Sequence, residues 1–126
     1  MRANGVALYS DSIFKEEITT LSPEIDKLKE IKAVKYKLKA DEKQEGKEKK
    51  THYGFLAQDL EKIYPDMIHT DQYGYKSIFY TELIPVLLGA IQQQQAEIER
   101  QAALISDLDK RLEKLEKSNI KELKKQ

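Results

Sequence analysis

Cysteine and tryptophan are absent from this chain of 126 residues, which has only three prolines and five glycines. Without cysteine, neither a disulfide framework nor a thiolate metal site can form. The two histidines, His52 and His69, are far apart in the sequence and lack the spacing of a metal-ligand pair. We therefore expect no metal and no other cofactor.

An excess of charge of either sign is also missing, because 22 basic residues balance 22 acidic residues. A balanced chain has no overall field that would draw it to nucleic acid or to an anionic membrane. Apolar runs fall well short of the roughly 20 residues that span a bilayer. The N-terminus has no apolar stretch behind Arg2, which argues against a signal peptide. We expect neither nucleic acid nor a membrane as a partner.

Charged residues make up 35% of the chain, which leaves few apolar side chains for the core of a monomer. Small chains of this kind often depend on oligomerisation for their stability. The length predicts one domain, or one small domain with an extended element.

Mixed, short patterns occupy the first part of the chain. Ser22 and Pro23 predict a helix start, with the serine as cap and the proline in the first turn. Residues 34–39 alternate apolar and basic side chains, as a half-buried strand does. After a highly charged loop, residues 52–55 resume the strand pattern, and Gly54 predicts a close backbone approach or a bulge.

Residues 57–64 predict a short helix that ends before Pro65, with Leu56, Leu60 and Ile63 directed inward. Further on, two strand-like segments flank the turn-forming residues 71–74, which predicts a hairpin. Together these patterns predict an α+β fold of short helices and one small antiparallel sheet.

From Thr81 the chain follows one long helical pattern. With Ile84 at heptad position a, isoleucine or leucine occupies position a throughout four heptads, which indicates a coiled coil. The predicted interface residues at positions a and d are Ile84, Leu87, Ile91, Gln94, Ile98, Gln101, Ile105, Leu108, Leu112 and Leu115. The glutamines at two d positions predict polar layers that specify register, so the heptads alone leave two or three strands open.

Ser10 is followed five places later by Lys15, a pair that could supply a nucleophile and its base. A lysine can serve as base when removal from water lowers its pKa well below the reference value of about 10.4. Positions five apart point about 140° away from each other on a helix and lie about 17 Å apart in a strand. The pair can therefore meet only if a turn folds Lys15 back, or if the lysine comes from a neighbouring subunit. From these residues alone, a short helix capped by Asp11 or Ser12 with a solvated Lys15 is the simpler interpretation.

Three motifs follow one another in an informative order. They are Ser10-Asp-x-x-x-Lys15, the block Gly-Phe-Leu-Ala-Gln at 54–58, and Leu-x-Pro-x-Leu at 83–87. This order resembles the endosialidase-type intramolecular chaperone domain, also called the peptidase S74 domain. Such domains stand at the C-terminus of phage tailspikes, tail fibres and related surface proteins. The resemblance runs from about Ser10 to about Leu115.

The resemblance implies a division into residues 1–9, a remnant of an upstream fibre, residues 10–80, a globular chaperone and autoprotease, and residues 81–126, a trimerisation helix. The helix would form a parallel trimeric coiled coil, and the homotrimer would register a slowly folding β-rich fibre of the same polypeptide. The protein would be a virion tail fibre or tailspike precursor made in the host cytoplasm, or a bacterial surface protein.

By the same resemblance, Ser10 would cleave the Tyr9–Ser10 bond with Lys15 as base, and Asp11 and Gln58 would support the reaction. Many members have arginine where this chain has Ile13. If that arginine orients Asp11 or an oxyanion, cleavage here is slow or absent. The alternatives are a trimerisation cap that does not cleave, and a coiled-coil adaptor that binds a separate protein through residues 81–115.

Overall fold

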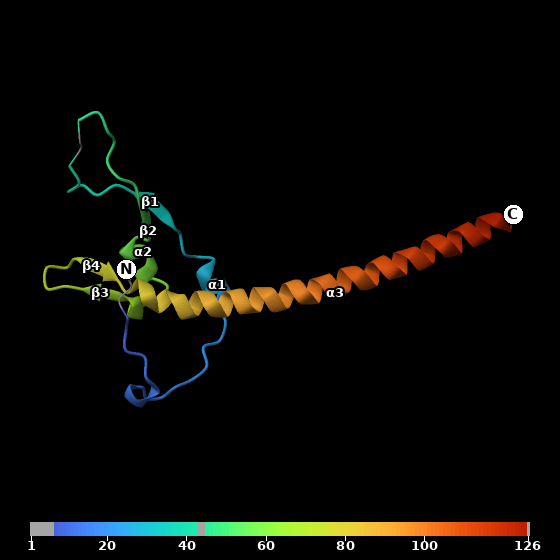
Figure 1. Cartoon of the computed structure of the whole chain (residues 1–126), viewed down its shortest axis with the longest axis horizontal. Helices are drawn as coiled ribbons and strands as arrows, with labels where there is room; N and C mark the ends of the chain where they lie inside the picture. Colours follow the sequence, from blue (N-terminus) through green and yellow to red (C-terminus); the bar gives the residue numbers. More distant parts are fainter. Residues whose placement is uncertain (1–6, 43–44, 126) are drawn as a thin grey trace.

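The computed structural model describes residues 7–42 and 45–125, so residues 1–6 of the predicted fibre remnant lie outside the described part. A small body of short elements carries one long helix, α3 (Leu83–Lys124), which projects far from it (Figure 1). The elements of the body are the 3-10 helices η1 (Ser12–Phe14), η2 (Pro65–Met67) and η3 (Tyr80–Glu82), the helices α1 (Ile25–Leu28) and α2 (Ala57–Glu61), and the strands β1 (Val34–Tyr36), β2 (His52–Gly54), β3 (Ile68–Thr70) and β4 (Lys76–Ile78). The predicted short helices, antiparallel pairing and long C-terminal helix are confirmed. None of the described helices combines the length and apolarity needed to cross a bilayer.

The described strands form two separate two-stranded sheets, so the prediction of a single sheet is wrong. β1 pairs with β2, with Val34 opposite Gly54, and β3 pairs with β4, with Ile68 opposite Ile78. Each sheet is formed by two strands that follow one another in the chain. The elements α2 and η2 separate β2 from β3, and α2 packs against the second sheet. The predicted hairpin turn is confirmed: Gly74 has φ +85, a conformation that glycine adopts at little cost.

The core is small and lies where α2, η2 and the start of α3 meet. Its buried residues are Leu60, Tyr64, Met67, Leu83 and Val86. Leu60, predicted to point inward, is only 1% exposed. Leu56, also predicted to point inward, is 51% exposed, because the chain is still extended at this residue and α2 begins only at Ala57.

The start of α1 also differs from the prediction. The first helical residue is Ile25, so Ser22 lies outside the helix and does not cap it. Glu24 precedes the helix with φ −121, and its carboxylate accepts a hydrogen bond from the Tyr64 hydroxyl. Lys27 lies over the Tyr64 ring, 5.3 Å from its centroid. The residue before this helix is thus in contact with a residue forty positions away.

The Tyr64 hydroxyl makes stability depend on pH in the alkaline range. Burial raises the pKa of Tyr64, and the hydrogen bond and negative charge of Glu24 raise it further. Because the folded-state pKa lies above the ordinary 10.0, this contribution to stability is complete below about pH 10 and is lost as the pH rises. We expect the free energy of unfolding to fall with pH above 10 more steeply than in Tyr64→Phe, by up to about 1.4 kcal/mol per pH unit.

Urea unfolding from about pH 8 to about pH 12 at one chain concentration measures this difference. Tyr73→Phe is the matched control, because Tyr73 is 77% exposed and its variant should keep the wild-type pH dependence. Equal slopes for wild type and Tyr64→Phe would contradict the assignment.

Gly54 lies directly against Tyr80, and the predicted close approach is confirmed. A Cβ atom at position 54 would overlap the Tyr80 hydroxyl. That hydroxyl accepts a hydrogen bond from the Phe55 backbone N–H at 3.2 Å, and the rings of Phe55 and Tyr80 stack 5.8 Å apart. The absence of a side chain at Gly54 therefore allows Tyr80, just before α3, to pack against the first sheet.

We expect Gly54→Ala to lower the free energy of unfolding by about 1–3 kcal/mol, because Tyr80 must shift. Adding Tyr80→Phe should restore part of the loss, since it removes the overlapping hydroxyl. Gly89→Ala is the control: no described atom outside its own helix lies within 4 Å of its new Cβ, so it should stabilise α3 by about 0.5–1 kcal/mol. Denaturant unfolding measures all four proteins, and a neutral Gly54→Ala would contradict the packing argument.

Candidate functional site

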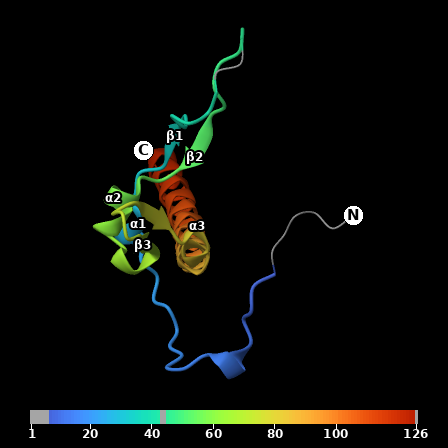
Figure 2. The same ribbon diagram turned by 90° about the vertical axis from the view of Figure 1, so that its left-hand side faces the viewer.

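The predicted catalytic pair lies on a segment that extends away from the body. Residues 7–22, here called the arm, are exposed throughout (Figure 2). The 3-10 helix η1 gives the arm its local shape. The Asp11 carboxylate caps η1 by accepting the Ile13 N–H at 3.1 Å, and the Lys15 N–H donates to the Ser12 carbonyl at 3.0 Å. Asp11 therefore supports the turn rather than contacting Ser10.

The turn brings Lys15 back to Ser10 within one chain. Lys15 Nζ donates a hydrogen bond to Ser10 Oγ at 2.8 Å, a distance suited to proton exchange. The cap by Asp11 and the contact between Ser10 and Lys15 thus occur together. The capped turn brings the side chains of Ser10 and Lys15, five residues apart in the sequence, within hydrogen-bond distance. The catalytic role of the pair stays a prediction.

The side chains of Ser10 and Lys15 are exposed to solvent. Tyr9, on the other side of the predicted scissile bond, is 97% exposed. The Tyr9 ring meets the Phe14 ring edge-on, with 6.3 Å between centroids. This arrangement therefore has the geometry of a nucleophile and base without the desolvation that would activate the base.

Gln58 lies apart from this pair. It belongs to α2 on the body, and both views place the arm away from α2 (Figures 1 and 2). In the described part of the chain no hydrogen bond joins Gln58 to Ser10 or Lys15. A single chain therefore does not assemble the predicted support of Ser10 by Gln58.

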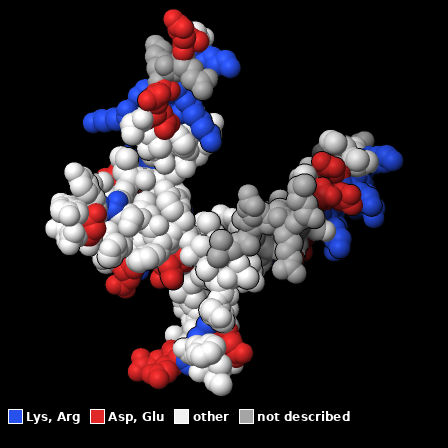
Figure 3. Space-filling view, turned by 60° about the vertical axis from the view of Figure 1, so that its left-hand side comes forward, with Lys and Arg blue, Asp and Glu red and all other residues white. Residues whose placement is uncertain are grey.

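Instead, Gln58 lines a groove on the body that the sequence did not predict. The groove has a volume of about 430 Å³ and is lined mainly by Tyr36, Phe55, Leu56, Gln58, Ile78 and Tyr80, with Lys76 among its polar residues. A neighbouring hollow shares Phe55 and Tyr80 and adds Lys35. Large areas of the body are uncharged on the face shown, while charges gather on the loop between β1 and β2 and toward the end of α3 (Figure 3). Aromatic and strand patterns were visible in the sequence, but they do not tell an exposed groove from a core.

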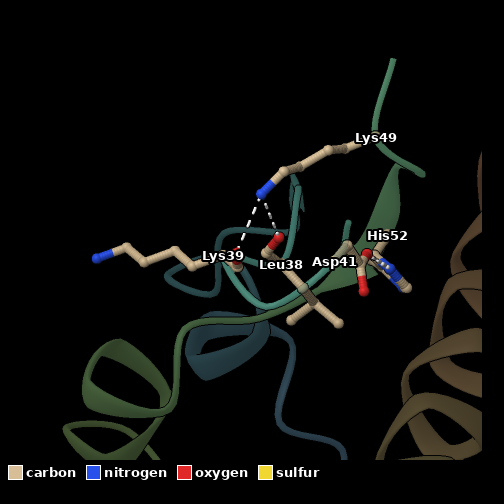
Figure 4. Close-up of polar contacts among 5 residues, drawn as sticks. All are labelled: Leu38, Lys39, Asp41, Lys49 and His52. Atoms are coloured by element: carbon tan, nitrogen blue, oxygen red, sulfur yellow. Dashed lines mark hydrogen bonds and ion pairs between the residues drawn. The ribbon is translucent and has the colours of Figure 1, made fainter. Parts of the chain in front are cut away.

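A second polar cluster holds the base of the charged loop between β1 and β2 (Figure 4). His52 Nε2 lies 3.1 Å from Asp41 Oδ2, and Lys49 Nζ donates to the carbonyls of Leu38 and Lys39 at 3.2 and 3.1 Å. These contacts tie one side of the loop to the other. Their arrangement is that of a structural clamp.

None of the predicted interface residues of α3 is among its buried residues, although Ile25 of α1 lines a hollow beside Gln94 and Ile98. Leu83, Val86 and Ala90 are buried against the body. The apolar side chains at positions a and d are about half exposed or more. The least exposed is Leu87 at 48%, and the most exposed is Ile105 at 66%. Gln101 donates to Glu97 on its own helix at 3.0 Å, and the hydrogen bond from Arg100 lowers the pKa of that glutamate.

Comparison with known protein families gives one match. Residues 10–69 match the family model Peptidase_S74, described as chaperone of endosialidase. No match was found among curated proteins. The matched region begins at Ser10 and runs through the Ser–Lys turn, the first sheet and α2 into β3. Over residues 10–69, just under half of the chain, the predicted resemblance to the chaperone-of-endosialidase family is confirmed.

Proposed function

We propose that this chain is a C-terminal intramolecular chaperone that forms a parallel homotrimer and sets the register of a β-rich fibre preceding it in the same polypeptide. The observation that carries the proposal is the apolar stripe of α3. Within the described residues, the apolar side chains of this stripe keep 48–66% of their surface exposed. The family of residues 10–69 supports the chaperone role, and the resemblance to tailspike and fibre modules supports three strands over two.

The physical reason for association lies in the length of α3. A helix of 42 residues extends for about 63 Å, and most of it leaves the body behind. Helical stability in proteins comes mainly from packing of an apolar face, which a neighbouring copy would supply here. A parallel arrangement puts the three bodies at one end, so three preceding chains start in register. Fibre folding is slow when its contacts are non-local, and holding the chains together shortens that search.

We also propose a single self-cleavage next to Ser10, supported by the 2.8 Å contact of Lys15 Nζ with Ser10 Oγ. Ser10 Oγ attacks the carbonyl carbon of Tyr9, and a neutral Lys15 takes the hydroxyl proton and delivers it to the Ser10 nitrogen. The C–N bond breaks and leaves Tyr9 as an ester on Ser10 Oγ. Water then hydrolyses the ester, which frees the fibre with a new carboxyl end and the module with Ser10 at its start.

Release would leave the fibre kinetically locked, because its unfolding barrier remains while the chaperone that set its register departs. The setting that fits this chemistry is a phage tail fibre or tailspike precursor in the host cytoplasm, or a bacterial surface protein. A test is to place residues 7–126 behind a trimeric β-rich fibre and to follow mass by light scattering and mass spectrometry. A trimer with a released module supports both proposals. An intact trimer supports the cap that does not cleave, and a module that is monomeric when studied without the fibre supports the adaptor.

A further inference from the structure

The arm has the character of a docking segment. Its apolar side chains are strongly exposed, including Tyr9 at 97%, Ile13 at 79% and Phe14 at 75%. Leu8 and Ile18 are also exposed, at 65% and 70%, and the rings of Tyr9 and Phe14 meet edge-on. Exposed apolar side chains gathered on one short segment are typical of a site of contact. The residues that would be covered are the neighbours of the Ser–Lys pair in the sequence.

The groove on the body complements the arm in chemistry. Its lining includes Leu56 at 51% and Tyr80 at 46% exposure, so it offers apolar surface. The arm carries three acidic residues, at 11, 16 and 17, against one basic residue at 15, a net charge of −2. Lys76 in the groove is already paired with Glu61 at 2.9 Å, so the complementary charge comes from Lys35 in the adjoining hollow. No aspartate or glutamate is among the described lining residues of either.

Two observations favour a second copy as the source of the arm. In the single chain, the arm extends away from the body (Figure 2), and none of its residues lines this groove. The groove also adjoins the proposed oligomer interface, because Tyr80 in its lining comes just before α3 and the first interface residue is Ile84. A copy packed along α3 would carry its arm to this end of the body.

We propose that the arm of one copy lies in the groove of a second copy and that this contact completes the cleavage site with Gln58 of the second copy. The inference rests on the proposed function and names how its site is regulated. Burial in the groove takes the Lys15 amine out of water, which favours its neutral form as base. The Gln58 amide N–H donates to the Tyr9 carbonyl oxygen as negative charge develops on it.

Disulfide trapping tests the docking without any need for cleavage, since the chain has no cysteine of its own. In a Ser10→Ala background, chains carrying Phe14→Cys are mixed and reassembled with mass-tagged chains carrying Leu56→Cys. We expect most of the covalent product under oxidising conditions to be the mixed 14–56 dimer. Tyr73→Cys replaces Leu56→Cys as the control, because Tyr73 is exposed on the β3–β4 turn, and should give little mixed product. Equal trapping with position 73, or a 14–56 bond within one chain carrying both cysteines, overturns the proposal.

Subunit mixing tests the contribution of Gln58 in a chain that cleaves. Gln58→Ala alone should slow cleavage by about 100-fold, the usual effect of losing one oxyanion donor. Mixing Gln58→Ala chains with Ser10→Ala chains should restore cleavage of the former, because the Ser10→Ala copies supply Gln58. Absence of rescue, while trapping succeeds, would remove Gln58 from the site. Absence of cleavage even in wild type with successful trapping would reject the autoprotease proposal and keep the docked arm.

Discussion

Replacing Ile98 and Ile105 with aspartate is expected to dissociate the protein into monomers. Both residues occupy position a on the exposed face of α3, with 57% and 66% of their surface open in a single chain. Burial of such a side chain contributes about 1.5–3 kcal/mol, and the substitution also places charges where an apolar layer should form. In a trimer each change is repeated three times around the axis. Light scattering should therefore show a mass near 14.6 kDa for the variant and three times that for the wild type.

The same experiment reports on the helix itself. Without partners, the far part of α3 loses its packing face, so the helical circular dichroism of the variant should fall. Ala103→Asp with Ser106→Asp is the matched control, because positions f and b of the heptad point away from the seam. A wild-type mass of one or two chains would overturn the trimer. A variant that stays assembled would overturn the heptad assignment.

The sequence was sufficient to predict the elements that are determined by residues close together in the chain. The hairpin at 71–74 depends on a glycine with positive φ and on Asp71, whose carboxylate accepts the N–H groups of Tyr73 and Tyr75 at 2.9 Å. Helix α3 contains its predicted heptads, from Ile84 to Leu115, and continues beyond them to Lys124. Gly54 was recognised because a glycine inside a strand pattern usually marks a close approach.

Features decided by distant contacts were not predictable in the same way. The hydrogen bond of Glu24, just before α1, joins it to Tyr64 forty positions away, and the division into two sheets depends on how α2 packs against β3 and β4. Sequence spacing likewise limited the Ser–Lys pair to a turn or a neighbouring subunit, without deciding between them. The groove that Gln58 lines was missed because its aromatic residues have the same pattern as buried ones.

The second large effect is expected in self-cleavage behind a trimeric fibre. Ser10→Ala should abolish release of the module, because it removes the attacking oxygen. Lys15→Ala should slow release by at least about 100-fold, since general-base catalysis typically contributes that much or more. Ser12→Ala and Lys32→Ala are matched controls: Ser12 contributes only its backbone to η1, and Lys32 is exposed outside the arm. Release that survives Ser10→Ala would end the assignment of the nucleophile.

We expect the proposed cleavage to depend on Ile13. It lies in η1 between Ser10 and Lys15 and is 79% exposed, so Ile13→Arg can be accommodated without disturbing a core. A guanidinium there would add a fixed donor beside Asp11 or the developing oxyanion, and we expect faster release than in wild type. Wild type should cleave slowly, and only when a trimeric fibre holds the Tyr9–Ser10 bond in place, because positioning contributes about 7–11 kcal/mol to such reactions. The released fraction, followed by mass over time with and without the fibre, measures both effects. If none of the variants cleaves, Ile13→Arg included, the module is a cap that registers the fibre and stays attached to it.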